Sequence, residues 1–195
     1  MICGFVLAKP GEKMGESKGN ALDPAALIQK HSADALRYWT AGAKLGTDTL
    51  FSEKELDGAK RFLTKLWNAA KFVFAQLADY APDGAAPTLP ADRWMLARCA
   101  ETAEKAAALL RAYEPGPARR EIDAETYGKA ARRSAQAALY GAFLCILKLY
   151  AIYVPHITEH LYGLYFRQFE GALSIHQLRW DAPAEPDGAL LRFGA

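Results

Sequence analysis

Residues 60–77 read Lys-Arg-Phe-Leu-Thr-Lys-Leu-Trp-Asn-Ala-Ala-Lys-Phe-Val-Phe-Ala-Gln-Leu, and this stretch decides the fold. Its apolar residues recur every three or four positions, which is the spacing of one helix face. They are Phe62, Leu66, Ala69, Val73 and Leu77, with Leu63, Trp67, Ala70 and Phe74 beside them. So wide an apolar face is typical of a helix that packs against several neighbours. The sequence therefore predicts a long helix over about residues 52–78, within a helical bundle.

Three further helices are predicted downstream. They cover about residues 92–113, with Asp92 as N-cap, then a segment that ends near Pro155, then 156–169. The residues expected to face inward are Leu96, Cys99, Ala103, Ala107 and Leu110 in the first, and Leu139, Phe143, Ile146, Leu147 and Tyr150 in the second. Proline and glycine interrupt the chain at 79–90 and 114–117, and residues 174–180 are expected to be extended. Helices joined in this way predict an antiparallel bundle.

The residues before the long helix predict a small α/β unit. Residues 1–7 suggest a strand, and the polar, glycine-bearing segment 12–20 suggests a mobile loop. Asp23 followed by Pro24 predicts the start of a short helix, and Ser32 predicts the cap of a second one over 33–43. The fold class expected is mainly α: an antiparallel helical bundle preceded by a small α/β remnant.

Composition excludes several classes of protein. The chain has 195 residues, 51% of them hydrophobic, which is enough to bury a core. Lys and Arg number 24 against 22 for Asp and Glu, so a nucleic-acid partner would need a local basic face. The three cysteines are far apart, which favours reduced thiols in a cytoplasmic protein. No apolar stretch is long enough to predict a membrane span.

The segment Lys13-Met14-Gly15-Glu16-Ser17 resembles the signature loop of class I aminoacyl-tRNA synthetases, usually Lys-Met-Ser-Lys-Ser. Other motifs of that family follow in order, covering nearly the whole chain. They are Gly4-Phe5-Val6-Leu7, Ala33-Asp34-Ala35-Leu36-Arg37, Leu66-Trp67-Asn68-Ala69, Asp92-Arg93-Trp94, Pro155-His156-Ile157-Thr158-Glu159 and Ser174-Ile175-His176. The Leu-Trp-Asn-Ala string is similar to the valine branch of the family.

The resemblance implies a division of the chain and a function. Residues 1–23 would end the catalytic domain, 24–52 would contact the tRNA stem, 53–181 would form the anticodon-binding bundle, and 182–195 would be a truncated tail. The family forms an aminoacyl-adenylate, here valyl-adenylate, from Mg-bound ATP and transfers the amino acid to tRNA. We expect this chain to recognise tRNA(Val), to be inactive alone and to require no cofactor itself. We also expect a monomer without a membrane partner.

The resemblance assigns Lys13, Met14, Gly15, Ser17 and Lys18 to the loop that handles ATP phosphates. Ammonium groups and backbone amides there stabilise the charge that develops as pyrophosphate leaves. This chain has Gly15 and Glu16 where the family has serine and lysine. A carboxylate beside a phosphate is repelled by about 1 kcal/mol at about 4 Å in water. We therefore expect impaired amino-acid activation.

Two basic segments are candidates for tRNA contact. The expected tRNA-binding residues are Lys60, Arg61, Lys65, Asn68, Lys71 and Phe72 on the long helix, and Arg132 and Arg133 in a stretch that also holds Arg119, Arg120 and Lys129. Lysine and arginine bind phosphates, while an exposed aromatic ring stacks on unpaired bases. The alternatives are a solvated charged face for the lysines and burial for Trp67. For Arg37 we expect an ion pair with a carboxylate.

The sequence allows three other interpretations. His156-Ile157-Thr158-Glu159-His160 fits a zinc-peptidase pattern, but it follows Pro155 in a first helical turn, and the family motif accounts for it. No metal site is therefore predicted. A non-catalytic RNA-binding paralogue is the alternative function, favoured by Glu16 and by the absence of an aromatic-rich helix that the family has after the segment 121–124. A purely structural interaction domain is the third hypothesis.

Overall fold

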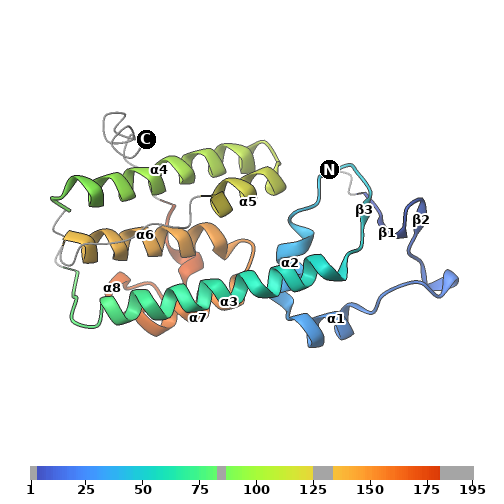
Figure 1. The fold of residues 1–195 in the computed structure, drawn as a ribbon, viewed down its shortest axis with the longest axis horizontal. Helices are drawn as coiled ribbons and strands as arrows, with labels where there is room; N and C mark the ends of the chain where they lie inside the picture. Colours follow the sequence, from blue (N-terminus) through green and yellow to red (C-terminus); the bar gives the residue numbers. More distant parts are fainter. Residues whose placement is uncertain (1–3, 83–86, 125–133, 181–195) are drawn as a thin grey trace.

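A computed structural model describes residues 4–82, 87–124 and 134–180 of the chain (Figure 1). Its N-terminal part contains a sheet of three short strands in the order β2-β1-β3. Strand β1 (Val6–Lys9) pairs antiparallel with β2 (Glu12–Lys13) and parallel with β3 (Thr49–Leu50). A side chain at Gly4 would place its Cβ 1.8 Å from the Thr47 carbonyl oxygen, so only glycine fits beside the returning chain.

Two short helices connect the sheet to the bundle, and their caps are those expected from the sequence. The Asp23 carboxylate accepts a hydrogen bond from Ala25 N at the start of α1 (Pro24–His31). The Ser32 hydroxyl accepts one from Ala35 N at the start of α2 (Ala33–Thr40). Both bonds satisfy amides that have no partner inside a helix.

The segment expected to be a mobile loop contains regular structure. Residues 12–13 form β2, and Glu16–Lys18 form a single 3₁₀ turn, η1, closed by Gly19 in the left-handed region at φ 65°. The Asn20 side chain accepts a hydrogen bond from Gly15 N at 2.9 Å and donates one to Glu12 Oε1 at 2.9 Å. Composition indicated a loop, but it could not show that an asparagine five residues away holds it in shape.

Helix α3 (Glu53–Gln76) confirms the prediction from the long apolar pattern. Ser52 caps it by accepting a hydrogen bond from Glu55 N. The buried residues are Leu56, Ala59, Leu66, Ala70 and Val73, followed by Leu77 at its end. The long apolar face therefore lies against the rest of the bundle, and the polar face is left outside.

Helix α4 (Pro90–Arg111) differs in detail from its prediction. Leu89 rather than Asp92 is the N-cap, because Pro90 fits the first helical position and starts the helix earlier. Thr102 and Ala106 are fully buried, whereas the expected inward residues are half-buried. The spacing of the apolar residues therefore predicted the helix but not the residues of it that are most buried.

Helix α5 (Pro115–Ala124) was missed, because its first residues were interpreted only as a break. Pro115 ends the preceding segment and opens the new helix. A Cβ at Gly116 would lie 3.2 Å from the Gly42 carbonyl oxygen, so glycine allows α5 to pack closely on the end of α2. The Pro-Gly-Pro sequence is thus a helix start as well as a break.

The C-terminal part of the bundle consists of α6, α7 and α8. Helix α6 (Ser134–Ala151) precedes α7 (Pro155–Leu161), which continues through a π turn, η2 (Tyr162–Phe166), into α8 (Arg167–Glu170). The expected helix over 156–169 is confirmed in extent. Residues 174–180, expected to be extended, contain a 3₁₀ turn, η3 (Ile175–Gln177).

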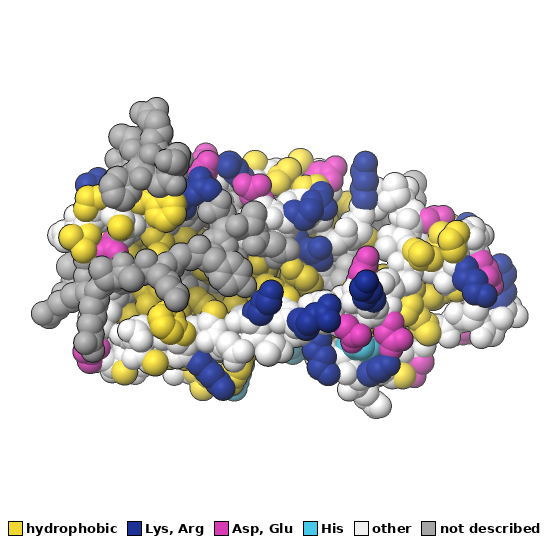
Figure 2. Space-filling model, in the orientation of Figure 1, with side chains coloured by type: hydrophobic (Ala, Val, Ile, Leu, Met, Phe, Trp, Pro, Cys, Tyr) yellow, Lys and Arg dark blue, Asp and Glu magenta, His cyan; other side chains and the backbone are white. Residues whose placement is uncertain are grey.

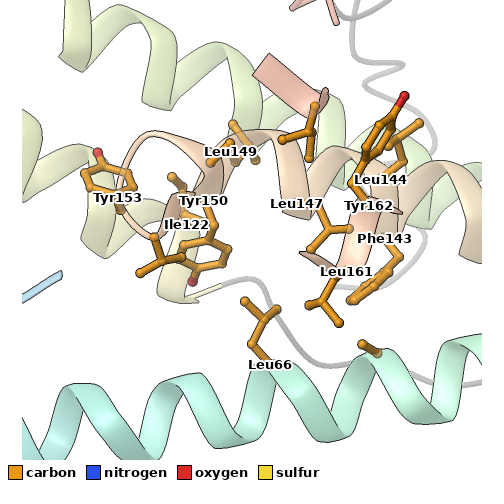
Figure 3. Close-up of a cluster of buried hydrophobic side chains, with 14 of the residues drawn as sticks. Leu66, Ile122, Phe143, Leu144, Leu147, Leu149, Tyr150, Tyr153, Leu161 and Tyr162 are labelled. Carbon is orange, nitrogen blue, oxygen red and sulfur yellow. The ribbon is translucent and has the colours of Figure 1, made fainter. Parts of the chain in front are cut away.

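The core lies where α3, α4, α6 and α7 meet, with α6 inside (Figures 1 and 3). Leu147, Tyr150, Leu161, Tyr162 and Phe166 are almost wholly buried there. Burying one such side chain stabilises the fold by roughly 1.5–3 kcal/mol. The mainly α bundle with a small α/β unit is therefore confirmed. Across the described ranges, no helix combines the length and apolar character needed to cross a bilayer.

Candidate nucleic-acid interface

The outer face of α3 carries four of the residues predicted from the sequence to contact RNA. Arg61, Lys65, Asn68 and Phe72 follow one another at intervals of four, three and four residues, so they form one line along the helix. All four are exposed, and the Phe72 side chain is 55% exposed. We call these four residues the α3 outer face. Figure 2 shows Lys and Arg side chains gathered over α3.

Lys60 and Lys71 lie on the flank of α3 beside this line. Lys71 Nζ is 5.9 Å from the centre of the Trp67 ring, within the range of a cation–π contact. Trp67 is half-buried, and its ring stacks on His160 of α7 with centroids 5.7 Å apart. Burial of Trp67 against the bundle was expected, but the imidazole partner was not.

The cations of α3 are not neutralised by acidic neighbours. Within the described residues, no carboxylate forms an ion pair with any of four cations of this helix: Lys60, Arg61, Lys65 and Lys71. By contrast, Lys30 pairs with Glu53, and Lys105 lies 2.9 Å from Glu101. Unpaired cations on one exposed helix face provide the local positive surface that phosphate binding requires.

Of the second basic stretch, Arg119 and Arg120 lie among the described residues. Arg132, Arg133 and Lys129 lie outside the described residues. Arg119 donates a hydrogen bond to the Tyr38 carbonyl oxygen at 2.7 Å, and its guanidinium lies 4.4 Å from the Tyr38 ring centre. Arg119 therefore stabilises the junction of α5 with α2, while Arg120 is exposed.

The loop assigned to ATP phosphates is only partly open to a ligand. Lys13 Nζ lies 3.5 Å above the Phe5 ring, and the Gly15 N–H is bound to Asn20. Ser17 and Lys18 are exposed, and so is Glu16, while Met14 is half-buried. Of the donors expected there, Lys18 and Ser17 are available, and the Glu16 carboxylate is exposed beside them.

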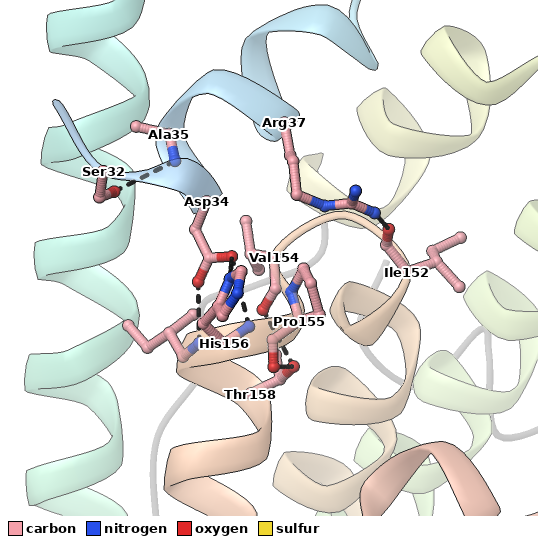
Figure 4. A network of polar contacts seen from close by, with 10 residues as sticks. Ser32, Asp34, Ala35, Arg37, Ile152, Val154, Pro155, His156 and Thr158 are labelled. Carbon is pink, nitrogen blue, oxygen red and sulfur yellow. Dashed lines mark hydrogen bonds and ion pairs between the residues drawn. The ribbon is translucent and has the colours of Figure 1, made fainter. Parts of the chain in front are cut away.

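Two acidic motif residues connect parts of the chain that are distant in sequence. The buried Asp34 carboxylate accepts hydrogen bonds from His156 N (3.3 Å), His156 Nδ1 (2.7 Å) and Ile157 N (2.8 Å), which caps α7 from α2 (Figure 4). Glu159 accepts from Ser174 Oγ at 2.8 Å and from Ile175 N at 3.0 Å. We call the contacts of Asp34 with His156 and Ile157, together with the neighbouring Arg37, the α2–α7 clamp.

Arg37 also belongs to the clamp, and the prediction that it pairs with a carboxylate was wrong. Its guanidinium donates to the Ile152 carbonyl oxygen at 3.0 Å, where α6 ends, instead of pairing with a carboxylate (Figure 4). A helix leaves its last carbonyls without partners, and arginine near a C-terminus satisfies them. Of the two histidines in the zinc-peptidase pattern, His156 contacts Asp34, and the ring of His160 stacks on Trp67. In the described part of the chain, no three His, Cys, Asp or Glu side chains gather so as to hold a metal.

Comparison with known families agrees with this architecture. Residues 1–52 match the family of class I tRNA synthetases (I, L, M and V), and residues 92–192 match the anticodon-binding domain of tRNA ligase. Both matched segments belong to proteins that attach amino acids to tRNA. The chain belongs to the class I tRNA synthetase family and carries its anticodon-binding domain.

Individual relatives indicate the branch. The valine–tRNA ligase of Thermococcus kodakarensis is 36% identical over 98% of this chain and 25% of its own length. That alignment has 219 positions, so the relative carries residues without a counterpart in this chain. The chain spans about a quarter of the length of the curated relatives it matches.

Two solved structures share the fold. The leucyl-tRNA synthetase of Agrobacterium radiobacter, in a ternary complex with tRNA and LeuAMS, aligns with a TM-score of 0.76 at 20% identity. The alignment covers 97% of this chain and 24% of the leucyl-tRNA synthetase chain. Methionyl-tRNA synthetase of Mycobacterium tuberculosis, in complex with methionyl-adenylate, aligns with a TM-score of 0.61 at 22% identity. The alignment covers 86% of this chain and 39% of the methionyl-tRNA synthetase chain.

Proposed function

We propose that this chain recognises tRNA(Val) through the α3 outer face together with Lys60 and Lys71, as part of a valine–tRNA ligase. The observation that carries the proposal is the set of exposed, unpaired cations beside the exposed ring of Phe72. Cations bind backbone phosphates, and the ring offers a stacking platform for an unpaired base of the anticodon loop. Arg132 and Arg133 are proposed to extend this surface.

The proposed division of labour follows the family. Residues 1–23 complete a catalytic domain, 24–52 contact the tRNA stem, 53–181 form the anticodon-binding bundle, and 182–195 follow it. In this proposal the chain works as a monomer in the cytoplasm. We propose that it does not attach valine to tRNA by itself, because it spans about a quarter of the length of the valine–tRNA ligases that it matches.

A titration against RNA tests the proposal. Fluorescence anisotropy at low salt would compare valine tRNA, a second tRNA, and valine tRNA with a substituted anticodon. We expect the tightest binding for unaltered valine tRNA and a loss of at least about tenfold on anticodon substitution, as for several lost base contacts. Equal binding to all three would contradict anticodon recognition, and no binding would leave the structural interaction domain.

Two of the groups expected to hold ATP phosphates are engaged within the chain. In this arrangement Lys13 is engaged with Phe5 and Gly15 N–H with Asn20, and Glu16 repels a triphosphate. Lys13, Met14, Gly15, Ser17 and Lys18 would have to rearrange to hold Mg-bound ATP. We therefore propose that the loop activates valine poorly.

Transplanting residues 11–20 into an active valine–tRNA ligase tests the loop directly. ATP–pyrophosphate exchange should fall by roughly tenfold or more, and Glu16→Lys in the transplanted loop should recover most of it. Full exchange with Glu16 in place would contradict the proposed impairment. Complete loss of exchange that Glu16→Lys does not restore would favour the alternative function, a non-catalytic RNA-binding paralogue.

A further inference from the structure

Three of the four histidines of the chain line one open hollow beside α7. The hollow has a volume of about 660 Å³, and His156, His160 and His176 line it together with Arg167 and Leu164. All five of these side chains belong to exposed residues. The hollow lies on α7, the π turn η2, the start of α8 and the 3₁₀ turn η3, and all of these are distant in sequence from the ATP loop. We call it the three-histidine hollow.

The charged groups around the hollow come from several elements and partly cancel. Asp34 of α2 lies 2.7 Å from His156 Nδ1, and Glu159 of α7 lies 3.0 Å from Arg167. Within the described residues, the rings of His160 and His176 have no hydrogen-bond partner. Two imidazoles therefore face the hollow with free nitrogen atoms.

Protonation decides the sign of this surface. With neutral imidazoles the two carboxylates, Asp34 and Glu159, outnumber the single guanidinium of Arg167. With protonated imidazoles the cations outnumber the carboxylates. Histidine side chains change charge between about pH 5 and 8. The attraction of the hollow for anions therefore depends on whether its imidazoles carry a proton.

One histidine of the hollow, His160, contacts α3. The ring of His160 stacks on the ring of Trp67. Lys71 Nζ lies 5.9 Å from the centre of the same Trp67 ring. Lys71 also lies next to Asn68 on the α3 outer face, because residues three apart are neighbours on a helix. A polyanion that contacts Lys71 would therefore lie close to Trp67 and to His160. Metal binding does not explain the cluster, because no three ligand side chains converge among the described residues.

We propose that the three-histidine hollow is an additional subsite for an RNA backbone phosphate, bound through protonated His160 and His176. This inference rests on the proposed function, because it takes the RNA on α3 as its ligand. Arg167 and His156 remain held by Glu159 and Asp34, so they shape the hollow while the two free imidazoles supply the contact. RNA affinity then rises as pH falls.

The test compares valine tRNA binding at pH 8.0 and pH 6.0, at one salt concentration, for the unaltered chain and for His160→Gln/His176→Gln. We expect the affinity of the unaltered chain to rise about tenfold at the lower pH, and that of the variant to rise less than about threefold. Gln168→Ala, an exposed neutral change on α8, is the matched control and should keep the full rise. Thermal unfolding at both pH values checks that all three chains remain folded.

Each outcome has one meaning. If the double variant keeps the full rise, the subsite is wrong, while tRNA binding at pH 8.0 still supports the proposed function. If the unaltered chain fails to bind at pH 8.0, the proposed function fails separately. NMR of the histidine C2 protons adds a second measurement: His160 and His176 should respond to tRNA well below the concentration of inorganic phosphate that shifts them. Equal responses would show a site for a free anion and overturn the RNA assignment.

Discussion

The α2–α7 clamp and the α3 outer face both contain charged side chains, but these charges have partners within the chain only in the clamp. In the clamp, Asp34 is buried and accepts three hydrogen bonds from the first turn of α7. On α3, Arg61 and Lys65 are exposed and unpaired among the described residues. A buried carboxylate needs partners within the chain. Exposed cations without partners are available to a second molecule.

This difference separates residues that hold the fold from residues proposed to bind RNA. Asp34, Arg37, His156 and Glu159 all come from segments that resemble family motifs, and each makes contacts within the chain. Their role in the structure is to join α2, α6, α7 and η3. Motif resemblance therefore identified the family correctly, but it does not by itself indicate which residues touch a ligand.

The largest effect is expected at the clamp. Asp34→Ala removes an acceptor from two backbone N–H groups and one imidazole, and should lower the free energy of unfolding by about 3 kcal/mol. Urea denaturation followed by circular dichroism measures this loss. Asp23→Ala, which removes an exposed cap from α1, is the control and should cost about 1 kcal/mol. Equal losses in the two variants would show that the clamp is no stronger than an ordinary cap.

A smaller effect is expected for the aromatic ring of the α3 outer face. Phe72→Ala should weaken tRNA binding about fivefold, the equivalent of about 1 kcal/mol, because a stacking surface is lost. Stability should change by less than about 0.5 kcal/mol, since the ring is 55% exposed. Tyr113→Ala removes a ring that is 69% exposed on another part of the molecule and serves as the control. If both variants bind tRNA like the unaltered chain, Phe72 is not a stacking platform.

The smallest effect concerns an exposed ion pair that is distinct from both regions. The hydrogen bond from Lys30 holds the pKa of Glu53 below its usual value. Stability from this pair is therefore present above the ordinary carboxylate pKa and is lost as pH falls through the lowered one. Lys30→Gln should reduce the fall in the urea midpoint between about pH 5 and pH 3, and only slightly, because both side chains are exposed. Lys54→Gln is the control, and the same reduction there would assign the effect to net charge.

The sequence predicted the helices better than their contacts. The spacing of apolar residues from Phe62 to Leu77 located α3, and Asp23 and Ser32 were recognised as caps because capping is a local interaction. Helix α5 was missed because a Pro-Gly-Pro sequence serves equally as a break and as a helix start. The Asp34–His156 bond joins residues 122 positions apart, and no spacing rule reaches that far.

The candidate site was predicted in part for the same reason. Arg61, Lys65, Asn68 and Phe72 share one face of a single helix, so periodicity alone placed them together. The three-histidine hollow combines α7, η2 and η3, and its histidines gave no local signal apart from a zinc-like pattern. Arg37 was expected to find a carboxylate, but the free carbonyl at the end of α6 is a partner that sequence does not reveal.

The central claim is that the unpaired cations of α3 hold RNA, and the salt dependence of binding tests it most directly. The slope of log affinity for valine tRNA against log salt would be measured for the unaltered chain and for Arg61→Gln/Lys65→Gln/Lys71→Gln. A control variant, Lys44→Gln/Lys105→Gln/Arg111→Gln, has the same net charge but keeps the α3 cations. We predict that the α3 variant loses about two to three units of slope and the control less than about one. Equal slopes for the two variants would show that RNA responds to net charge alone, and would contradict the claim.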